Sequence, residues 1–152
     1  MYHVEITPEA DSGFKVRSSN YEFSIGIKGK GITPPDTLLA GLGSCIGVYL
    51  RRYLEGANIT LKDFSITVEA EFSTVQESIK LSCSTAKIAS KNLSRSDFLE
   101  EPPVCFRNID VRIDLKGLKL EQRRKQALLE FIGNCPVHNT LKASPNVEVT
   151  II

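Results

Sequence analysis

The sequence predicts an α+β domain in which several short strands accompany two principal helices. Three observations carry this prediction: alternating apolar and polar residues at 21–28, an uncharged helical segment within 36–55, and an amphipathic segment at 119–134. The chain has 152 residues, a usual size for one domain and enough to bury a hydrophobic core. We therefore expect a single domain over 1–152, with the element order β-β-β-α-β-β-α-β.

The first part of the chain is expected to form three short strands, at 2–7, 13–18 and 21–28. The third shows the period-two alternation that is typical of a half-buried strand. Its apolar positions are Tyr21, Phe23, Ile25 and Ile27.

A long helix is expected over 36–55, because Thr33-Pro34-Pro35 followed by Asp36 is a good helix start. No charged residue occurs between Asp36 and Arg51, so the helix should be buried in a core or an interface on nearly every face. Each interior glycine costs about 1 kcal/mol relative to alanine, which indicates close packing of another backbone. These glycines are Gly41, Gly43 and Gly47, and Gly56 suits the C-terminal cap.

The remaining elements follow from the same patterns. Further strands are expected at 62–73, 79–88, 104–115 (with a register break near Asn108) and 146–152, and a short helix at 94–101. The second principal helix, 119–134, has one apolar face that includes Leu128 and Phe131. Continuing that face by helical spacing reaches Cys135, so this thiol should point inward.

Composition excludes several classes of protein. A net charge of +1 argues against a nucleic-acid binder that depends on bulk electrostatics. We see no basic and apolar leader at the start, and the uncharged run 37–50 is too short to span a bilayer. We therefore expect a soluble, cytoplasmic protein with no membrane partner. Four cysteines do not make a disulfide scaffold, so a functional cysteine there would be catalytic, redox-sensing or metal-binding.

Two of the cysteines lie in informative settings. Cys135 precedes a proline, which favours a position near a helix N-terminus, where the dipole and free N–H groups stabilise a thiolate. Cys45 lies in mid-helix and would be unreactive unless a cation or a hydrogen-bond donor reaches it. Asp36 and an arginine from the N-terminal strands, with Arg17 the best placed, are candidates for a charged network around it.

Each of these residues also has a purely structural interpretation. Cys45 and Cys135 could be small buried apolar residues, Asp36 a plain helix cap, and Arg17 an ordinary strand residue. His138 lies three residues after Cys135, so it could be a ligand together with that thiol, or tune the reactivity of the thiol. It could also be a partly exposed helix residue. Structural roles are also expected for the remaining candidates, Cys83, Cys105 and His3.

Two motifs together resemble the OsmC/Ohr family of osmotically inducible and organic hydroperoxide resistance proteins. They are Pro35-Asp36-Thr37-Leu38-Leu39-Ala40-Gly41-Leu42-Gly43-Ser44-Cys45 and Cys135-Pro136-Val137-His138-Asn139-Thr140-Leu141. The resemblance implies an OsmC-like fold, with curved antiparallel sheets around two long central helices in an intertwined homodimer. Two active sites would lie at the dimer interface, with no cofactor and no metal.

The resemblance also implies a thiol peroxidase. Cys45 would be the peroxidatic cysteine and become a sulfenic acid, and Cys135 would resolve it to a disulfide that a dithiol of the lipoyl type reduces. The family uses an arginine and a glutamate to activate the first thiolate. Asp36 stands where the glutamate falls, one methylene shorter, and Arg17 would be the arginine.

Three functions follow from these residues. The first is a peroxidase for organic hydroperoxides, and weakly for hydrogen peroxide, with the apolar helix supplying a pocket for an alkyl chain. The second is a non-enzymatic thiol redox protein or regulator with little turnover. The third is a metal-binding protein that uses Cys45, Cys135 and His138, although these do not form a closed tetrahedral set.

Overall fold

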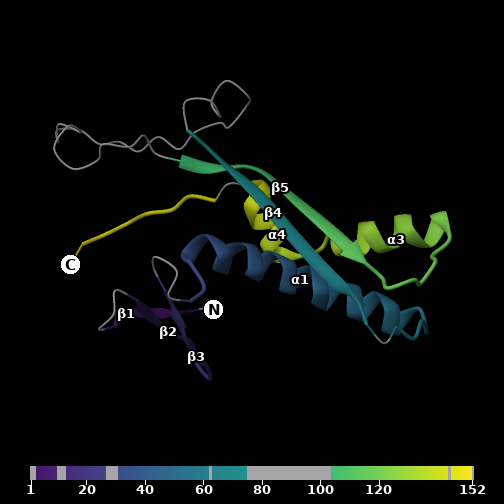
Figure 1. Cartoon of the computed structure of the whole chain (residues 1–152), viewed down its shortest axis with the longest axis horizontal. Coiled ribbons are helices and arrows are strands. Elements are labelled where there is room, and N and C mark those ends of the chain that lie inside the picture. Colours follow the sequence, from purple (N-terminus) through teal and green to yellow (C-terminus); the bar gives the residue numbers. More distant parts are fainter. Residues whose placement is uncertain are drawn as a thin grey trace. The chain divides into compact units, whose positions relative to one another are not determined.

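The computed structural model describes residues 3–9, 13–26, 31–61, 63–74, 104–143 and 145–151. Figure 1 shows the helices and strands of the chain. The described residues fall into two compact units: 69–74 and 104–111 belong to one, and the others belong to the second. The α+β prediction is confirmed, because strands and helices both occur and the strands of the N-terminal sheet pair antiparallel. The expected strand 79–88, the expected helix 94–101 and Cys83 lie outside the described residues.

An antiparallel sheet of three strands begins the chain, as predicted. It contains β1 (Glu5–Pro8), β2 (Phe14–Arg17) and β3 (Glu22–Ile25), in that order. The register aligns Ile6 with Val16 and Val16 with Phe23, so one face of the sheet is apolar. That face carries Ile6, Pro8, Phe14, Val16, Phe23 and Ile25.

The third strand was predicted to be half-buried, but in the single chain the apolar face of the sheet is covered only in part. The side chain of Val16 is buried, but 59% of Ile6 and 49% of Phe23 remain exposed. The opposite face of the sheet is polar and holds ion pairs between exposed side chains, including Arg17 with Glu5. An exposed ion pair contributes about 0–1 kcal/mol, so these pairs add little stability.

The long helix α1 (Pro34–Gly56) confirms the helix predicted over 36–55. Its start is a capping box: the Asp36 N–H donates to Thr33 Oγ1, and the Thr33 N–H donates to Asp36 Oδ2, both at 3.3 Å. The structural prediction for Asp36 is thus refined, because Thr33 is the N-cap and Asp36 completes the box. Gly56 is the last helical residue and has no left-handed backbone; Asn58, with φ 53°, takes that conformation instead.

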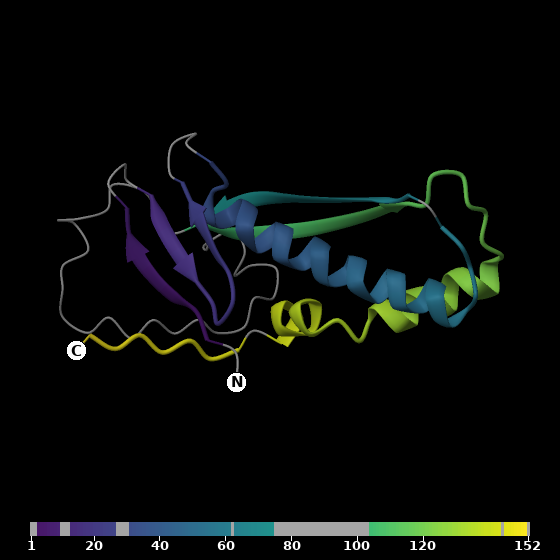
Figure 2. The same cartoon turned by 90° about the horizontal axis from the view of Figure 1, so that it is seen from below.

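The hydrophobic core lies along one face of α1, against α3 (Gln122–Ile132) and α4 (Pro136–Ala143). Both helices run beside α1 in the two views (Figures 1 and 2). The Tyr53 hydroxyl also donates to the Arg124 carbonyl at 3.1 Å, which ties α1 to α3. The buried side chains here are Leu42, Ile46, Leu50, Leu54, Leu128, Ile132 and Cys135.

Burial of α1 on nearly every face is not found within the single chain. Leu38 is 41% and Val48 is 48% exposed. The glycines of α1 also differ in how closely other residues approach them. A Cβ on Gly43 would lie 3.0 Å from Val68 Cγ2, so the expected close packing occurs there, against a side chain rather than a backbone. A Cβ on Gly41 would meet none of the described residues within 4 Å, so the close packing expected at this glycine is not found in the described part of the chain.

The second half of the chain agrees with the prediction in part. Strands β4 (Ser65–Thr74) and β5 (Val104–Asp114) form a two-stranded sheet, and β5 runs continuously through Asn108. The helix expected over 119–134 is shorter, because α3 starts at Gln122. The strand expected at 146–152 is wrong: residues 145–151 form no strand, and Val147, Val149 and Ile151 are each more than 80% exposed.

None of the described helices is both long and apolar enough to cross a bilayer. This agrees with the short uncharged run seen in the sequence.

Candidate active site

Two thiols that are 90 residues apart in the sequence meet between α1 and α4. Cys45 lies in the middle of α1, and Cys135 immediately precedes α4. The Cys135 S–H donates to Cys45 Sγ, and the two sulfur atoms are 2.8 Å apart. The fold therefore brings together the two cysteines that the sequence analysis singled out.

The chain around Cys135 turns sharply between two helices. The Cys135 N–H donates to the Ile132 carbonyl at 2.9 Å, which closes the turn after α3. Pro136 then opens α4, a position where a missing N–H costs no hydrogen bond. The Asn139 N–H donates to the Cys135 carbonyl at 3.0 Å, the first hydrogen bond of the new helix. The prediction that Cys135 lies at a helix N-terminus and points inward is confirmed, because it is fully buried.

Free N–H groups at the start of α4 point at both sulfurs. The His138 N–H donates to Cys135 Sγ at 3.4 Å, and the Val137 N–H donates to Cys45 Sγ. The first N–H groups of a helix have no partner within the helix and carry partial positive charge. This helix end can thus stabilise negative charge on either sulfur, which is the help that Cys45 lacks on its own helix.

The two thiols differ in access to solvent. Cys135 has no exposed surface, whereas Cys45 is partly exposed. Burial raises the pKa of the Cys45 thiol above its ordinary value, and the neighbouring sulfur of Cys135 raises that pKa further. The Val137 N–H opposes these effects and lowers it. Because the net direction is upward, the single chain holds Cys45 mainly as a thiol at neutral pH.

The structure does not bring Arg17 or Asp36 to these thiols. Arg17 lies on β2, is more than half exposed, and pairs with Glu5 (3.5 Å) and Glu22 (3.8 Å) on its own sheet. Asp36 precedes Cys45 by nine residues, which is about two and a half helical turns and places the two on opposite sides of α1. The capping box accounts for the position of Asp36.

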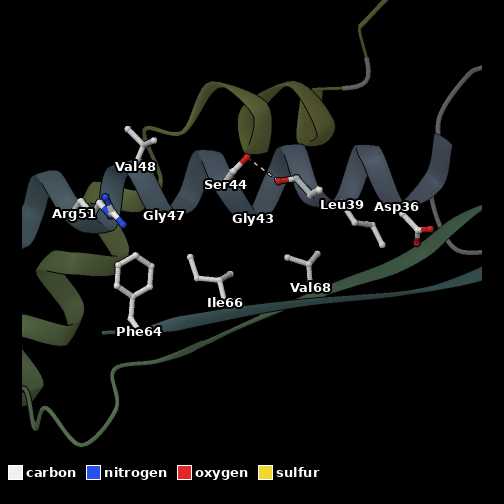
Figure 3. Close-up of a pocket in the computed structure, with 11 residues that line it drawn as sticks. Asp36, Leu39, Gly43, Ser44, Gly47, Val48, Arg51, Phe64, Ile66 and Val68 are labelled. Atoms are coloured by element: carbon white, nitrogen blue, oxygen red, sulfur yellow. Dashed lines mark hydrogen bonds between the residues drawn. The ribbon is translucent and has the colours of Figure 1, made fainter. Parts of the chain in front are cut away.

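An open groove of about 600 Å³ runs along the opposite side of α1 from Cys45, against residues 64–68. In Figure 3, Phe64, Ile66 and Val68 point toward the helix, and Asp36 and Arg51 mark the two ends of the groove. The Arg51 guanidinium lies 5.7 Å from the centre of the Phe64 ring. The sequence predicted an apolar pocket on this helix, but not that residues 64–68 form its second wall. Residues at every fourth position of α1 line the groove: Leu39, Gly43, Gly47 and Arg51.

His138, three residues after Cys135, holds a buried polar atom. Its Nδ1 is buried and has no hydrogen-bond partner within the described part of the chain. Leaving such an atom unpaired costs about 1–3 kcal/mol. Side chains on a helix point back toward its N-terminus, over the residues three and four positions earlier. The His138 ring therefore extends toward Cys135.

The other candidates behave as the structural interpretation expects. Cys105 is half-buried in β5, and His3 is exposed ahead of β1. In the residues that the structure describes, no three histidine, cysteine or acidic side chains cluster as metal ligands would.

Comparison with known proteins gives consistent results. The model of the family described as OsmC-like protein matches residues 27–150. Among curated proteins, no sequence matches the chain. Among solved structures, an OsmC-like protein from Mycoplasma pneumoniae has a TM-score of 0.63 at 19% identity, covering 93% of this chain and 87% of its own.

Two further structures are named as organic hydroperoxide resistance proteins. The one from Legionella pneumophila has a TM-score of 0.58 at 14% identity, covering 93% of this chain and 89% of its own. OhrB of Bacillus subtilis has a TM-score of 0.55 at 15% identity, covering 92% and 90%. At these identities the likeness shows a shared fold.

Proposed function

This chain belongs to the OsmC-like protein family, and from that premise we propose that it is a thiol peroxidase that reduces organic hydroperoxides, and hydrogen peroxide weakly, in the cytoplasm. The observation that carries the proposal is the pair of sulfurs 2.8 Å apart, each receiving a helix N–H. The names of the two hydroperoxide resistance proteins support the substrate class.

In the first step, Cys45 reacts with the peroxide because it is the thiol with access to solvent. Its thiolate attacks the terminal peroxide oxygen and breaks the O–O bond. The alkoxide leaves and takes up a proton to become an alcohol, and Cys45 becomes a sulfenic acid. The Val137 N–H stabilises the attacking thiolate.

In the second step, the sulfur of Cys135 attacks the sulfur of the Cys45 sulfenic acid. An S–S bond forms, the S–O bond breaks, and the oxygen leaves as water. No large movement is required, because the two sulfurs already lie together. A dithiol of the lipoyl type then gives two electrons and two protons to the disulfide and becomes a disulfide itself. This restores both thiols.

One observation favours a second candidate function. Since burial and Cys135 raise the pKa of Cys45, only a small fraction of this thiol is ionised at neutral pH. Because the thiolate is the nucleophile, peroxide turnover would then be slow. The same cysteine pair would in that case form a regulatory disulfide in a non-enzymatic redox protein.

Turnover separates the two functions. The reduced wild type is mixed with cumene hydroperoxide in a stopped-flow instrument, with dihydrolipoamide in excess, and peroxide loss is followed over many equivalents. A peroxidase consumes the peroxide in many cycles. Formation of the disulfide with about one equivalent consumed would instead establish the redox switch.

We further propose that the protein is a homodimer. The apolar face of the β1–β3 sheet leaves Ile6 and Phe23 about half exposed, and the C-terminal residues Val147, Val149 and Ile151 are almost fully exposed. A second copy that covered these side chains would remove a large apolar surface from water.

Light scattering tests the dimer. The wild type should have twice the mass of the 16.8 kDa chain. Phe23→Glu should shift it toward the monomer by at least tenfold in the dissociation constant, because a carboxylate would enter an apolar contact. The matched control is Ser24→Glu, which places the same charge on the polar face of the sheet. A monomeric wild type, or equal effects of both variants, would contradict the proposal.

A further inference from the structure

We propose that His138 transfers the proton in the disulfide-forming step. This inference rests on the proposed peroxidase chemistry and concerns the resolution of the Cys45 sulfenic acid by Cys135. The imidazole of His138 has a buried nitrogen with no partner among the described residues, and its backbone N–H already binds the resolving sulfur. The reaction so far leaves this imidazole unused.

The placement of His138 supports this role. It lies in the first turn of α4, three residues after Cys135, and its N–H reaches Cys135 Sγ at 3.4 Å. The imidazole is joined to the same residue and extends back over the preceding turn, toward that sulfur. The backbone hydrogen bond thus fixes His138 beside the resolving cysteine, and its imidazole belongs to the same first turn of α4.

The chemistry of the step requires a group of this kind. When Cys135 attacks the sulfenic acid, its thiol must lose a proton, and the oxygen that leaves Cys45 must gain one to depart as water. An imidazole can accept a proton and release it near neutral pH. Nδ1 of His138 takes the proton of the Cys135 thiol while the S–S bond forms. It then gives that proton to the leaving hydroxide as the S–O bond breaks, so His138 is unchanged at the end.

Besides His138, the ionisable groups that the described structure places at α4 include Cys45 on α1, Cys135 immediately before α4, and Lys142 in the last turn of α4. The two thiols are the reacting groups, and Lys142 is exposed. Among the described residues, His138 is the group best suited to carry the proton.

The test separates the two chemical steps. Reduced protein is mixed with one equivalent of cumene hydroperoxide, and sulfenic acid formation and disulfide formation are followed by rapid quenching and mass spectrometry. His138→Asn should form the sulfenic acid at the wild-type rate but form the disulfide at least tenfold more slowly. The pH dependence of disulfide formation that the imidazole imposes should also disappear in this variant.

Two further variants guard against a structural explanation. His138→Phe removes the unpaired nitrogen, so it should keep or raise the melting temperature while still slowing the disulfide step. Lys142→Gln, the matched control for a charge on α4, should change neither step. A wild-type rate of disulfide formation in His138→Asn overturns this inference alone. A wild type that never forms the sulfenic acid overturns the peroxidase proposal and this inference together.

Discussion

Replacing Cys45 by serine should abolish peroxide consumption. We expect a loss of about a thousandfold or more in kcat/KM, because a serine hydroxyl is far less ionised and less nucleophilic than a thiol at neutral pH. Among the described residues, the other thiol at the site is Cys135, which is fully buried and cannot meet the peroxide in its place. Cumene hydroperoxide consumption with dihydrolipoamide as reductant measures the effect.

Serine variants of two other cysteines test whether the loss of turnover is specific to Cys45. Cys135→Ser should still react once with peroxide but then accumulate the Cys45 sulfenic acid, which a dimedone adduct reports by mass. Cys105→Ser should leave turnover unchanged, because Cys105 lies on β5 and has no role in the proposed reaction. Residual turnover in Cys45→Ser, or its loss in Cys105→Ser, would refute the assignment of the peroxidatic cysteine.

Leu50→Ala should strongly reduce the stability of the folded chain. Leu50 is fully buried on the core face of α1, so its truncation leaves a cavity between helices. The free energy of unfolding should fall by about 2–5 kcal/mol. For a chain of this length that corresponds to a decrease in melting temperature of about 4–20 °C, which thermal denaturation followed by circular dichroism would show.

The matched control lies two residues away on the same helix. Val48→Ala removes a side chain that is 48% exposed, so we expect a change of less than about 1 kcal/mol in the single chain. A cost of Val48→Ala as large as that of Leu50→Ala would mean that another surface covers Val48. The core assignment would be wrong if Leu50→Ala unfolded at the wild-type temperature.

Most elements of the fold could be predicted from local patterns. The helix α1 was predictable because its start has a proline and a capping box. In addition, no proline or charged residue interrupts it between Asp36 and Arg51. The strand expected at 146–152 failed for a physical reason. Alternating residues favour a strand, but a strand forms only where a partner supplies hydrogen bonds, and within the described chain none is paired with 145–151.

The site could be predicted less completely. The sequence identifies Cys135 as a helix N-terminal residue, because a following proline has a strong positional preference. It gives a poor guide to the partners of Cys45, since it does not show which charged residues of other elements reach this helix. The structure places Asp36 in the capping box and Arg17 among the glutamates of its own sheet. The groove from Asp36 to Arg51 depends on which strand packs against the glycines of α1, which spacing alone does not specify.

By itself, the sequence determined the elements whose cause is local: the uncharged glycine-containing helix, the turn at Cys135-Pro136 and the alternating strands. Only the tertiary structure decided that Cys45 and Cys135 lie 2.8 Å apart, that α4 directs its N–H groups at both sulfurs, and that His138 Nδ1 is buried with no partner in the described part of the chain. The reason is that these contacts join α1 to residues about 90 positions later. Their geometry depends on how the helices pack, which local propensity does not encode.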